Sequence, residues 1–280
     1  MLTAGALGAG AAGCGSSQAT FDPVAQAADA TTHSGGSQVA MSVTVQAPEL
    51  STPVTITGNG SFNMSRQEGE LSFTVQGLPA AALAQVPAGP LMITELFKHG
   101  VVYMSSPLFD GRLPGGARWM KLDLSRFESG LGIDVQQMTS GQSDPSQYLQ
   151  YLRAAGGTIK AVGHEPIRGT ATTRYEGSID LNRAAESLPA SDRAKLREAM
   201  QKLISQSGTG SLPVAVWIDA HHLVRRMSLR IPLSSGGKTG AATVAYELFG
   251  FGTAPAVRPP ASSETFDATK LSLQSLSGGG

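Results

Sequence analysis

Cysteine, aromatic residues and charge are all scarce in this sequence of 280 residues, and each scarcity excludes a class of protein. A single cysteine forms no internal disulfide and cannot supply a thiolate zinc cluster. Charged residues make up 15% of the chain, and 21 basic side chains balance 21 acidic ones, which excludes a broad electrostatic footprint for nucleic acid. Aromatic residues reach only 6%, and no uncharged apolar run approaches the ~20 residues of a membrane-spanning helix.

The one cysteine, Cys14, follows a short apolar run without charge, residues 2–13 (LTAGALGAGAAG). This arrangement resembles a lipobox, where bacterial lipoprotein precursors receive diacylglycerol on the cysteine sulfur and are cut before it. The resemblance implies a signal peptide over residues 1–13, cleavage between Gly13 and Cys14, and a palmitate-type lipid anchor on Cys14. Ala11 stands where Leu or Val is usual, and no basic residue precedes the apolar run. A free cysteine in a disordered Ala/Gly tail is the alternative.

The central part of the chain is dominated by a period of two. Apolar residues alternate with small polar ones at residues 39–45 and 71–75, as in antiparallel strands with one wet face. Further strands are predicted at residues 54–57, 62–64, 119–123, 167–179, 214–218, 223–231 and 243–249. The segment Leu91–Phe97 is apolar on both faces apart from Thr94 and Glu95, which predicts a strand covered on both sides.

Turn signals separate these strands, at residues 58–60 (GNG), 67–69 (QEG), 99–100 (HG) and 235–237 (SGG). Two helices are predicted between strands. One begins at Asp144-Pro145 and ends at Gly156-Gly157, and the other runs from about Ser191 to Ser207 with an apolar stripe that includes Ile204.

This order predicts one α+β domain, a large antiparallel sheet with helices on one face. The predicted organisation is a signal peptide at residues 1–13, a lipidated N-terminus and tether at 14–36, the domain at 37–252, and an irregular tail at 253–280.

Residues with catalytic or metal-binding potential are few. The pair His221-His222 adjoins Asp219, but neighbouring residues of a strand point to opposite faces, so a hairpin turn is favoured over a metal site. The basic residues Arg225, Arg226 and Arg230 could meet anionic lipid, although the wet face of a strand is the favoured interpretation. No catalytic sequence signature occurs, so we predict no enzyme, no metal and no cofactor.

Residues 164–181 (HEPIRGTATTRYEGSIDL) resemble a strand pair of the LppX/LprAFG-type bacterial lipoproteins. Residues 213–219 (PVAVWID) with 223–227 (LVRRM) are similar to a hairpin of the same group, and residues 246–250 (YELFG) to the strand that follows. The resemblance covers most of the domain in order, and its motifs are structural.

The resemblance implies a fold like that of the LolA/LolB lipoprotein carriers, a curved antiparallel half-barrel with helices on its concave face. It also implies an acyl lipid or glycolipid ligand in a cavity between sheet and helices, in a monomeric carrier or chaperone. The predicted location is the extracellular face of the bacterial cytoplasmic membrane. A filled core with no ligand is equally compatible with the apolar stripes, so no ligand-binding residue is assigned. An unliganded lipoprotein that binds proteins as a scaffold or sensor is the alternative function, and an unrecognised hydrolase using His164, His221 or His222 ranks third.

Overall fold

The computed structural model describes residues 22–63, 66–80, 90–126, 159–181, 201, 204–205, 208–235, 237–253 and 256–272. Within these ranges the chain forms one large sheet, one helix of three turns, a single helical turn at residues 269–272 and three short 3₁₀ turns. None of the helices in the described ranges combines the length and the apolar character needed to cross a membrane.

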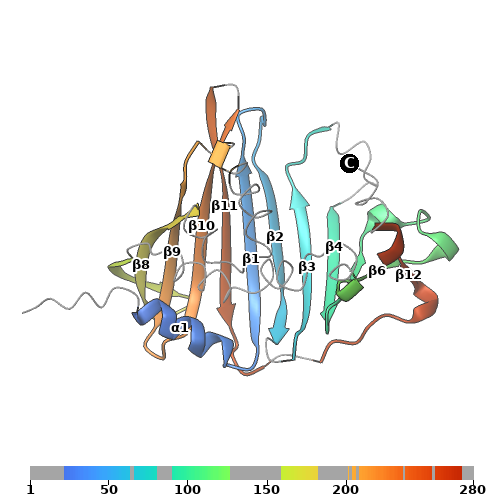
Figure 1. Ribbon diagram of the computed structural model, residues 1–280, viewed down its shortest axis with the longest axis horizontal. Coiled ribbons are helices and arrows are strands. Elements are labelled where there is room, and N and C mark those ends of the chain that lie inside the picture. The colour runs from blue at the N-terminus through green and yellow to red at the C-terminus, as the bar shows by residue number, and fades with distance from the viewer. Residues whose placement is uncertain are drawn as a thin grey trace, which may run out of the picture.

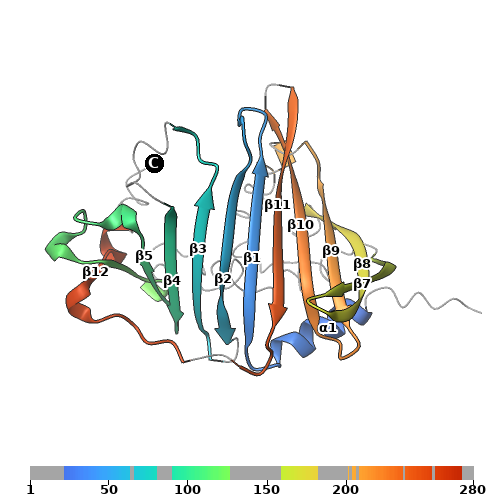
Figure 2. The same ribbon diagram turned by 180° about the vertical axis from the view of Figure 1, so that it is seen from behind.

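Twelve strands form a single curved, open sheet in the order β12-β6-β5-β4-β3-β2-β1-β11-β10-β9-β8-β7 (Figures 1 and 2). All neighbours are antiparallel except β12, which pairs with β6 in parallel. The strands are β1 (Ser37–Gln46), β2 (Val54–Asn63), β3 (Glu68–Gln76), β4 (Leu91–Lys98), β5 (Val101–Ser105), β6 (Trp119–Asp123), β7 (Lys160–Ile167), β8 (Thr170–Asp180), β9 (Ser211–Asp219), β10 (Val224–Ser235), β11 (Lys238–Phe249) and β12 (Thr265–Asp267). The predicted fold class, a large curved sheet with strands of period two, is confirmed.

Tight hairpins connect several neighbouring strands at residues that adopt a positive φ. His99 and Gly100 (φ 46° and 78°) join β4 to β5, and Arg168 and Gly169 (φ 48° and 79°) join β7 to β8. Two consecutive positive φ values are the mark of the type I′ turn, whose twist matches that of the flanking strands. The second hairpin divides the run predicted as one strand over residues 167–179.

One predicted turn is wrong. Residues Gly58-Asn59-Gly60 do not end a strand, because β2 continues through them from Val54 to Asn63. A Cβ atom on Gly58 would lie 2.5 Å from the ring of Phe73, and one on Gly60 would lie 1.9 Å from the backbone oxygen of Glu70. These glycines are therefore required by close approach of β2 to β3, which is the other common reason for glycine in a strand.

The helix α1 (Asp22–Thr32) lies across β8, β9 and β10, in front of the sheet in Figure 1. Its buried residues Val24, Ala27, Ala28 and Thr31 recur at helical spacing, so one side of α1 faces the sheet. The hydroxyl of Thr31 accepts a hydrogen bond of 2.9 Å from the backbone N–H of Val224, which fixes the end of α1 at the start of β10. We call the face of the sheet that α1 contacts the inner face, and the opposite one the outer face.

The main core lies on the inner face of β8–β10 and includes one side of α1. It contains the three apolar residues of α1 and these buried residues of the sheet and its connections: Ile179, Leu181, Leu212, Val214, Val216, Ile218, Val224 and Met227. Ile204 also packs against this core from the range of the second predicted helix, in which residues 201 and 204–205 are helical. The rest of that helix, and all of the helix predicted at Asp144–Gly157, lie outside the described residues.

Both ends of the domain differ from the predicted boundaries. The range predicted as a tether contains α1, because alanine and threonine side chains at helical spacing can be buried although the segment is polar on average. The range predicted as an irregular tail contains β12, and Lys121 on β6 contacts Asp267 at 3.1 Å. The tail also receives a hydrogen bond of 3.0 Å from the Nζ of Lys98 to the backbone oxygen of Val257. Long-range pairing of this kind leaves little local signal in the sequence.

Candidate ligand-binding face

The inner face of β2–β6 is an apolar surface, which we call the β2–β6 face. Antiparallel pairing places the side chains of facing residues on the same side of the sheet, so the registers define this face. Its members are apolar residues and glycines with one exception, Glu95: Val54, Ile56, Gly58, Gly60, Phe62, Gly69, Leu71, Phe73, Val75, Leu91, Ile93, Glu95, Phe97, Val102, Met104, Met120 and Leu122.

Aromatic rings and glycines alternate on this face. The ring of Phe73 covers Gly58, and the ring of Phe62 covers Gly69, since a Cβ atom added to either glycine would lie within 2.5 Å of the ring. Phe62 also stacks on Phe97, with ring centroids 6.0 Å apart. This arrangement lays the rings flat along the sheet and leaves a smooth apolar surface.

The β2–β6 face is only partly covered. Phe62 and Leu91 are buried, whereas the other apolar side chains of this face, such as Leu71, Ile93 and Met104, are of intermediate exposure. On the inner face of β9, by contrast, Leu212, Val214, Val216 and Ile218 are all at most 6% exposed. The apolar surface of β2–β6 is therefore available for contact with an apolar partner.

Glu95 interrupts this surface near its centre. Its register partners are Leu71 on β3 and Met104 on β5, and Ile93 and Phe97 flank it on the same side of β4. Burial raises the pKa of the Glu95 carboxyl, because an apolar environment disfavours the charged form.

The position of Glu95 on an apolar face is detectable in the sequence, although the prediction for Leu91–Phe97 does not include it. The prediction that Leu91–Phe97 forms a strand is confirmed, but its outer face is covered only in part, because Leu96 is 7% exposed there whereas Met92 is 49% exposed. With a period of two, Leu91, Ile93, Glu95 and Phe97 share one face. The alternation alone could therefore have placed Glu95 among apolar residues.

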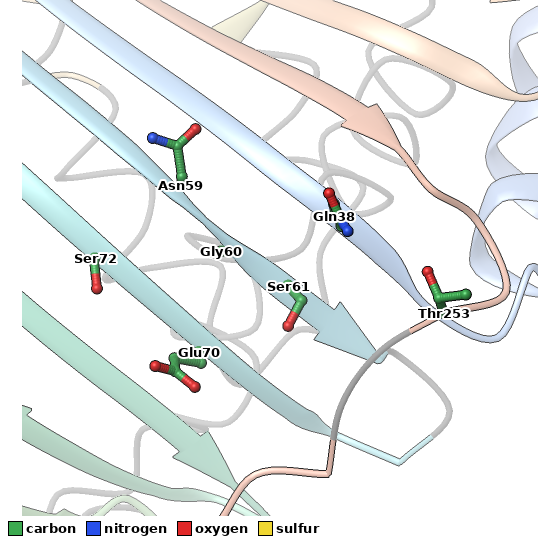
Figure 3. Close-up of a pocket in the computed structure, with 7 residues that line it drawn as sticks. All are labelled: Gln38, Asn59, Gly60, Ser61, Glu70, Ser72 and Thr253. Atoms are coloured by element: carbon green, nitrogen blue, oxygen red, sulfur yellow. The ribbon is translucent and has the colours of Figure 1, made fainter.

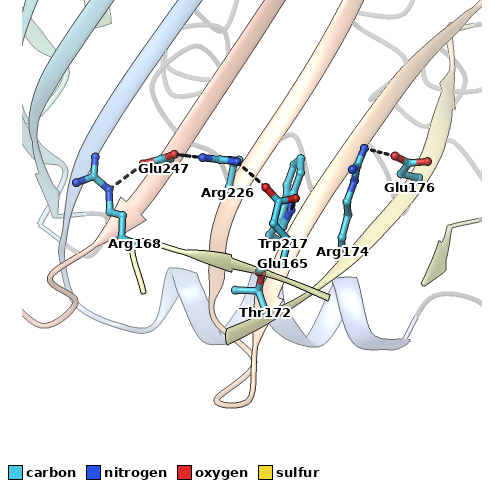
Figure 4. Close-up of polar contacts among 8 residues, drawn as sticks. All are labelled: Glu165, Arg168, Thr172, Arg174, Glu176, Trp217, Arg226 and Glu247. Carbon is cyan, nitrogen blue, oxygen red and sulfur yellow. Dashed lines mark hydrogen bonds and ion pairs between the residues drawn. The ribbon is translucent and has the colours of Figure 1, made fainter. Parts of the chain in front are cut away.

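On the outer face, a network of ion pairs and hydrogen bonds links five strands from β7 to β11 (Figure 4). Glu247 accepts hydrogen bonds from the Nε of Arg168 at 2.8 Å and from the Nε of Arg226 at 3.0 Å. Arg226 also contacts Glu165 at 3.5 Å, and Glu165 accepts a hydrogen bond of 2.8 Å from the indole N–H of Trp217. Burial works against the charge of Glu247, but the hydrogen bonds from Arg226 and Arg168 outweigh it and lower its pKa.

This network covers an aromatic side chain. Trp217 is only 6% exposed although it lies on the outer face, and the guanidinium groups of Arg174 and Arg226 lie 5.2 and 5.4 Å from its ring centre. Cation–π contacts and ion pairs across strands stabilise a sheet near its edge. Arg226 is thus part of the solvated face of the sheet, as the favoured interpretation of Arg225 and Arg226 predicts.

The polar tip after β9 is a hairpin turn. The carboxylate of Asp219 accepts hydrogen bonds of 2.9 Å from the backbone N–H groups of His221 and Leu223, and its second oxygen contacts Arg225 at 2.6 Å. His221 and His222 are exposed, and among the described residues no three metal-ligating side chains gather. The oxygens of Asp219 are therefore occupied by the turn and by Arg225.

The remaining histidines are also at the surface. His164 lies exposed on the edge strand β7 and lines a hollow of about 510 Å³ with Glu165, Thr172 and Asp219. In this hollow the hydroxyl of Thr172 donates to the backbone oxygen of Glu165. Thr173, which also lines this hollow, places its hydroxyl 3.4 Å from the Nδ1 of His164, and this contact is exposed to solvent on the β7–β8 hairpin.

A second hollow, of about 300 Å³, lies on the outer face of β1–β3 (Figure 3). Its lining has no large apolar side chain and consists of Gln38, Asn59, Gly60, Ser61, Glu70, Ser72 and Thr253. The two faces of the same strands therefore differ in chemistry. The outer face suits water, whereas the inner face suits hydrocarbon.

The residues predicted for lipidation and signal cleavage, Gly13 and Cys14, lie outside the described residues, which begin at residue 22.

No protein-family model matches the sequence. A curated sequence from Streptomyces griseus, named an uncharacterized 31.2 kDa protein in the rplA-rplJ intergenic region, is 27% identical over 163 residues. The match covers 57% of this chain and 51% of that protein, so the chain spans about half the length of this curated relative.

Among solved structures, the fold is similar to two mycobacterial lipoproteins. LppX of Mycobacterium tuberculosis has a TM-score of 0.47 and 17% identity, and LprF of Mycobacterium bovis has a TM-score of 0.46 and 15% identity. Each comparison covers 87% of this chain and all of the other. A putative outer membrane lipoprotein-sorting protein domain from Vibrio parahaemolyticus has a TM-score of 0.28 and 10% identity, over 85% of this chain and 94% of that one.

Proposed function

We propose that this chain is a lipoprotein of the bacterial cell envelope that binds an acyl-chain lipid on its β2–β6 face, as a carrier or chaperone without catalysis. A lipid anchor on Cys14, after cleavage at Gly13, would hold it at the extracellular face of the cytoplasmic membrane.

One observation supports the proposal that the protein binds a lipid. The inner face of β2–β6 is apolar over five adjacent strands, yet most of its apolar side chains keep an intermediate exposure. An apolar surface of this breadth favours contact with another apolar body over contact with water.

Hydrocarbon suits this surface for energetic reasons. Each methylene that leaves water contributes ~0.8 kcal/mol, so ten methylenes contribute about 8 kcal/mol before the cost of ordering the chain. A bound acyl chain therefore needs no polar contact along its length. The flat phenylalanine rings and the flexible Met104 and Met120 suit an extended, conformationally variable chain.

The test uses the full chain with Cys14→Ser, so that any lipid found comes from the domain and not from acylation. Native mass spectrometry and lipid extraction of the purified protein would return a long-chain lipid, and a fluorescent fatty-acyl probe would bind and be displaced by it. A clean unliganded mass, together with no probe binding, would remove the lipid-binding function. A stoichiometric protein partner in a pull-down from membrane extracts would then favour the scaffold alternative.

A matched pair of variants locates the binding surface. Ile93→Trp fills space on the β2–β6 face, whereas Met92→Trp adds the same bulk on the outer face of the same strand. We expect Ile93→Trp to weaken binding of the acyl probe by about tenfold or more, and Met92→Trp to leave it unchanged. Equal effects from the two variants would contradict binding at the inner face.

The anchor is tested in cells. An alkyne-tagged palmitate fed to the native host would label the wild-type protein, and Cys14→Ser would lose both the label and the membrane association. Protease treatment of intact spheroplasts would then digest the anchored protein if it faces outward. An unlabelled wild-type protein that keeps residues 1–13 would contradict the proposed processing.

A further inference from the structure

Glu95 is the most unusual residue of the described sheet, because it places a carboxyl group within an apolar surface. The inward positions of β2 to β6 hold no other ionisable side chain, and the four nearest positions on this face are Leu71, Ile93, Phe97 and Met104. Burying a carboxyl group in apolar surroundings lowers the stability of the fold unless a hydrogen bond or an ion pair compensates. If Glu95 had a structural role, we would therefore expect a polar partner beside it.

Within the described residues, Glu95 has no such partner. No described residue forms a hydrogen bond or an ion pair with the Glu95 side chain. Burial is the cause of the raised pKa of its carboxyl group. The nearest cation in sequence, Lys98, contacts Glu68 at 3.2 Å and the backbone of Val257, and its position in the register is on the outer face. The cost of Glu95 is thus not offset by an ion pair with a described residue.

The cost is offset if the ligand supplies the missing hydrogen bond. We infer that Glu95 is a specificity-determining residue, whose carboxyl group accepts a hydrogen bond from a hydroxyl group of an uncharged amphiphile lying on the β2–β6 face. This inference rests on the proposed function and adds to it the chemical class of the ligand.

The chemistry of the face favours this class over others. A fatty acid or a phospholipid would bring a negative charge towards Glu95, and β2 to β6 provide no cation on their inner side to receive it. An amine would have to lose the hydration of a full positive charge, which costs far more than the desolvation of a hydroxyl group. A hydroxyl donor satisfies the carboxyl group at the smallest cost.

Three probes with the same acyl chain separate these classes: a monoacylglycerol, its fatty acid, and the fatty acid methyl ester. The monoacylglycerol is uncharged and has hydroxyl donors, the fatty acid is charged, and the ester has neither charge nor donor. We expect the Cys14→Ser chain at neutral pH to bind the monoacylglycerol about tenfold more tightly than the methyl ester, the effect of one hydrogen bond to a charged group.

Variants assign this preference to Glu95. Glu95→Leu should abolish it by making the two uncharged probes bind alike, while Glu95→Gln should keep an acceptor oxygen and improve binding of the fatty acid. Glu70→Leu and Glu70→Gln are the controls, because Glu70 lies exposed on the outer face of the adjacent strand β3. They should leave all three affinities unchanged.

The outcomes distinguish the two proposals. If no probe binds to the chain before mutation, the proposed function fails and the role of Glu95 fails with it. If all probes bind but Glu95→Leu keeps the preference for monoacylglycerol, only the role of Glu95 is overturned. A long-chain amine of the same acyl length, added as a fourth probe, would also overturn it by binding most tightly, because the ligand class would then be cationic.

Discussion

Two regions of the same sheet use the same alternation of apolar and polar residues to different ends. On the inner face of β8–β10, which α1 contacts, a buried core forms in which Val216 and Ala27 are fully buried. On the β2–β6 face, the apolar residues are equally continuous, but most are half-buried and one position holds a carboxyl group. The comparison teaches that an apolar stripe shows which face of a strand avoids water, and not whether protein or ligand covers it.

The largest expected effect tests this contrast in packing, through one isoleucine from each region. Ile179 is 6% exposed in the main core, whereas Ile93 is of intermediate exposure on the β2–β6 face. Ile179→Ala should lower the free energy of unfolding by about 3 kcal/mol, and Ile93→Ala by about 1 kcal/mol, because a partly covered site loses less burial and leaves less of a cavity. Urea denaturation of the two variants measures the difference. Equal losses would mean that both regions are packed cores.

The second largest effect on stability is expected where the backbones of β2 and β3 approach closely. The β2–β6 region is tightly packed at this point although its inner face is only partly covered. Gly60→Ala should cost about 2 kcal/mol, because the added methyl group would overlap the backbone oxygen of Glu70 and force β2 away from β3. Gly163→Ala on the edge strand β7 is the control, since a methyl group added there would meet nothing within 4 Å beyond its chain neighbours. Thermal denaturation of both variants checks the prediction, and a silent Gly60→Ala would contradict the close approach.

The two regions also differ in what surrounds their carboxylates. The larger effect on stability is expected for Glu247, in the ion-pair network on the outer face of β7–β11. Arg226 and Arg168 lower the pKa of Glu247 against the effect of burial, so the stability it contributes is present above the ordinary glutamate pKa of about 4.3. This contribution is lost as the pH falls through the lowered pKa of the folded state. Glu247→Gln should therefore destabilise the protein at pH 7 by about 1 kcal/mol and have no effect in strong acid. Urea titrations across this pH range measure the difference, and a loss that persists in acid would contradict it.

Glu95 should give the smallest effect on stability, with the opposite sign. Burial raises its pKa, so folding is favoured most below the ordinary glutamate pKa, and this advantage is lost as the pH rises through the raised value. Glu95→Gln should therefore raise the midpoint of unfolding slightly at pH 7 and leave it unchanged in acid. The same titrations measure it against the original chain. Destabilisation by Glu95→Gln at neutral pH would indicate a structural partner for the carboxylate.

The strands were predictable where local pattern and tertiary role agree. Residues 119–123 were predicted as a strand and form β6 with the same bounds, because a short amphipathic run between turn residues has few other uses. Residues 58–60 have the composition of a turn but lie within β2, because glycine permits both a turn and a close approach of strands. Only the ring of Phe73 and the backbone of β3 decide between them.

The same limit applies to the candidate site. The alternation in β4 is enough to align Glu95 with Leu91, Ile93 and Phe97, so the sequence contains the carboxyl group of the apolar face. The sequence alone does not show that Leu71 and Met104 lie beside Glu95. Their positions depend on the pairing of β3 and β5 with β4. The network around Trp217 also joins residues 165 and 247, which no local signal connects.

By itself, then, the sequence determined the class of fold, the strand periodicity, the polar hairpin at Asp219, and the absence of any recognised catalytic signature. Tertiary structure alone decided that α1 packs against the inner face of β8–β10, that β12 joins the far edge, and that the apolar surface of β2–β6 surrounds Glu95. The physical reason is that side-chain alternation is a property of each strand, whereas burial depends on which distant segment comes to lie against it.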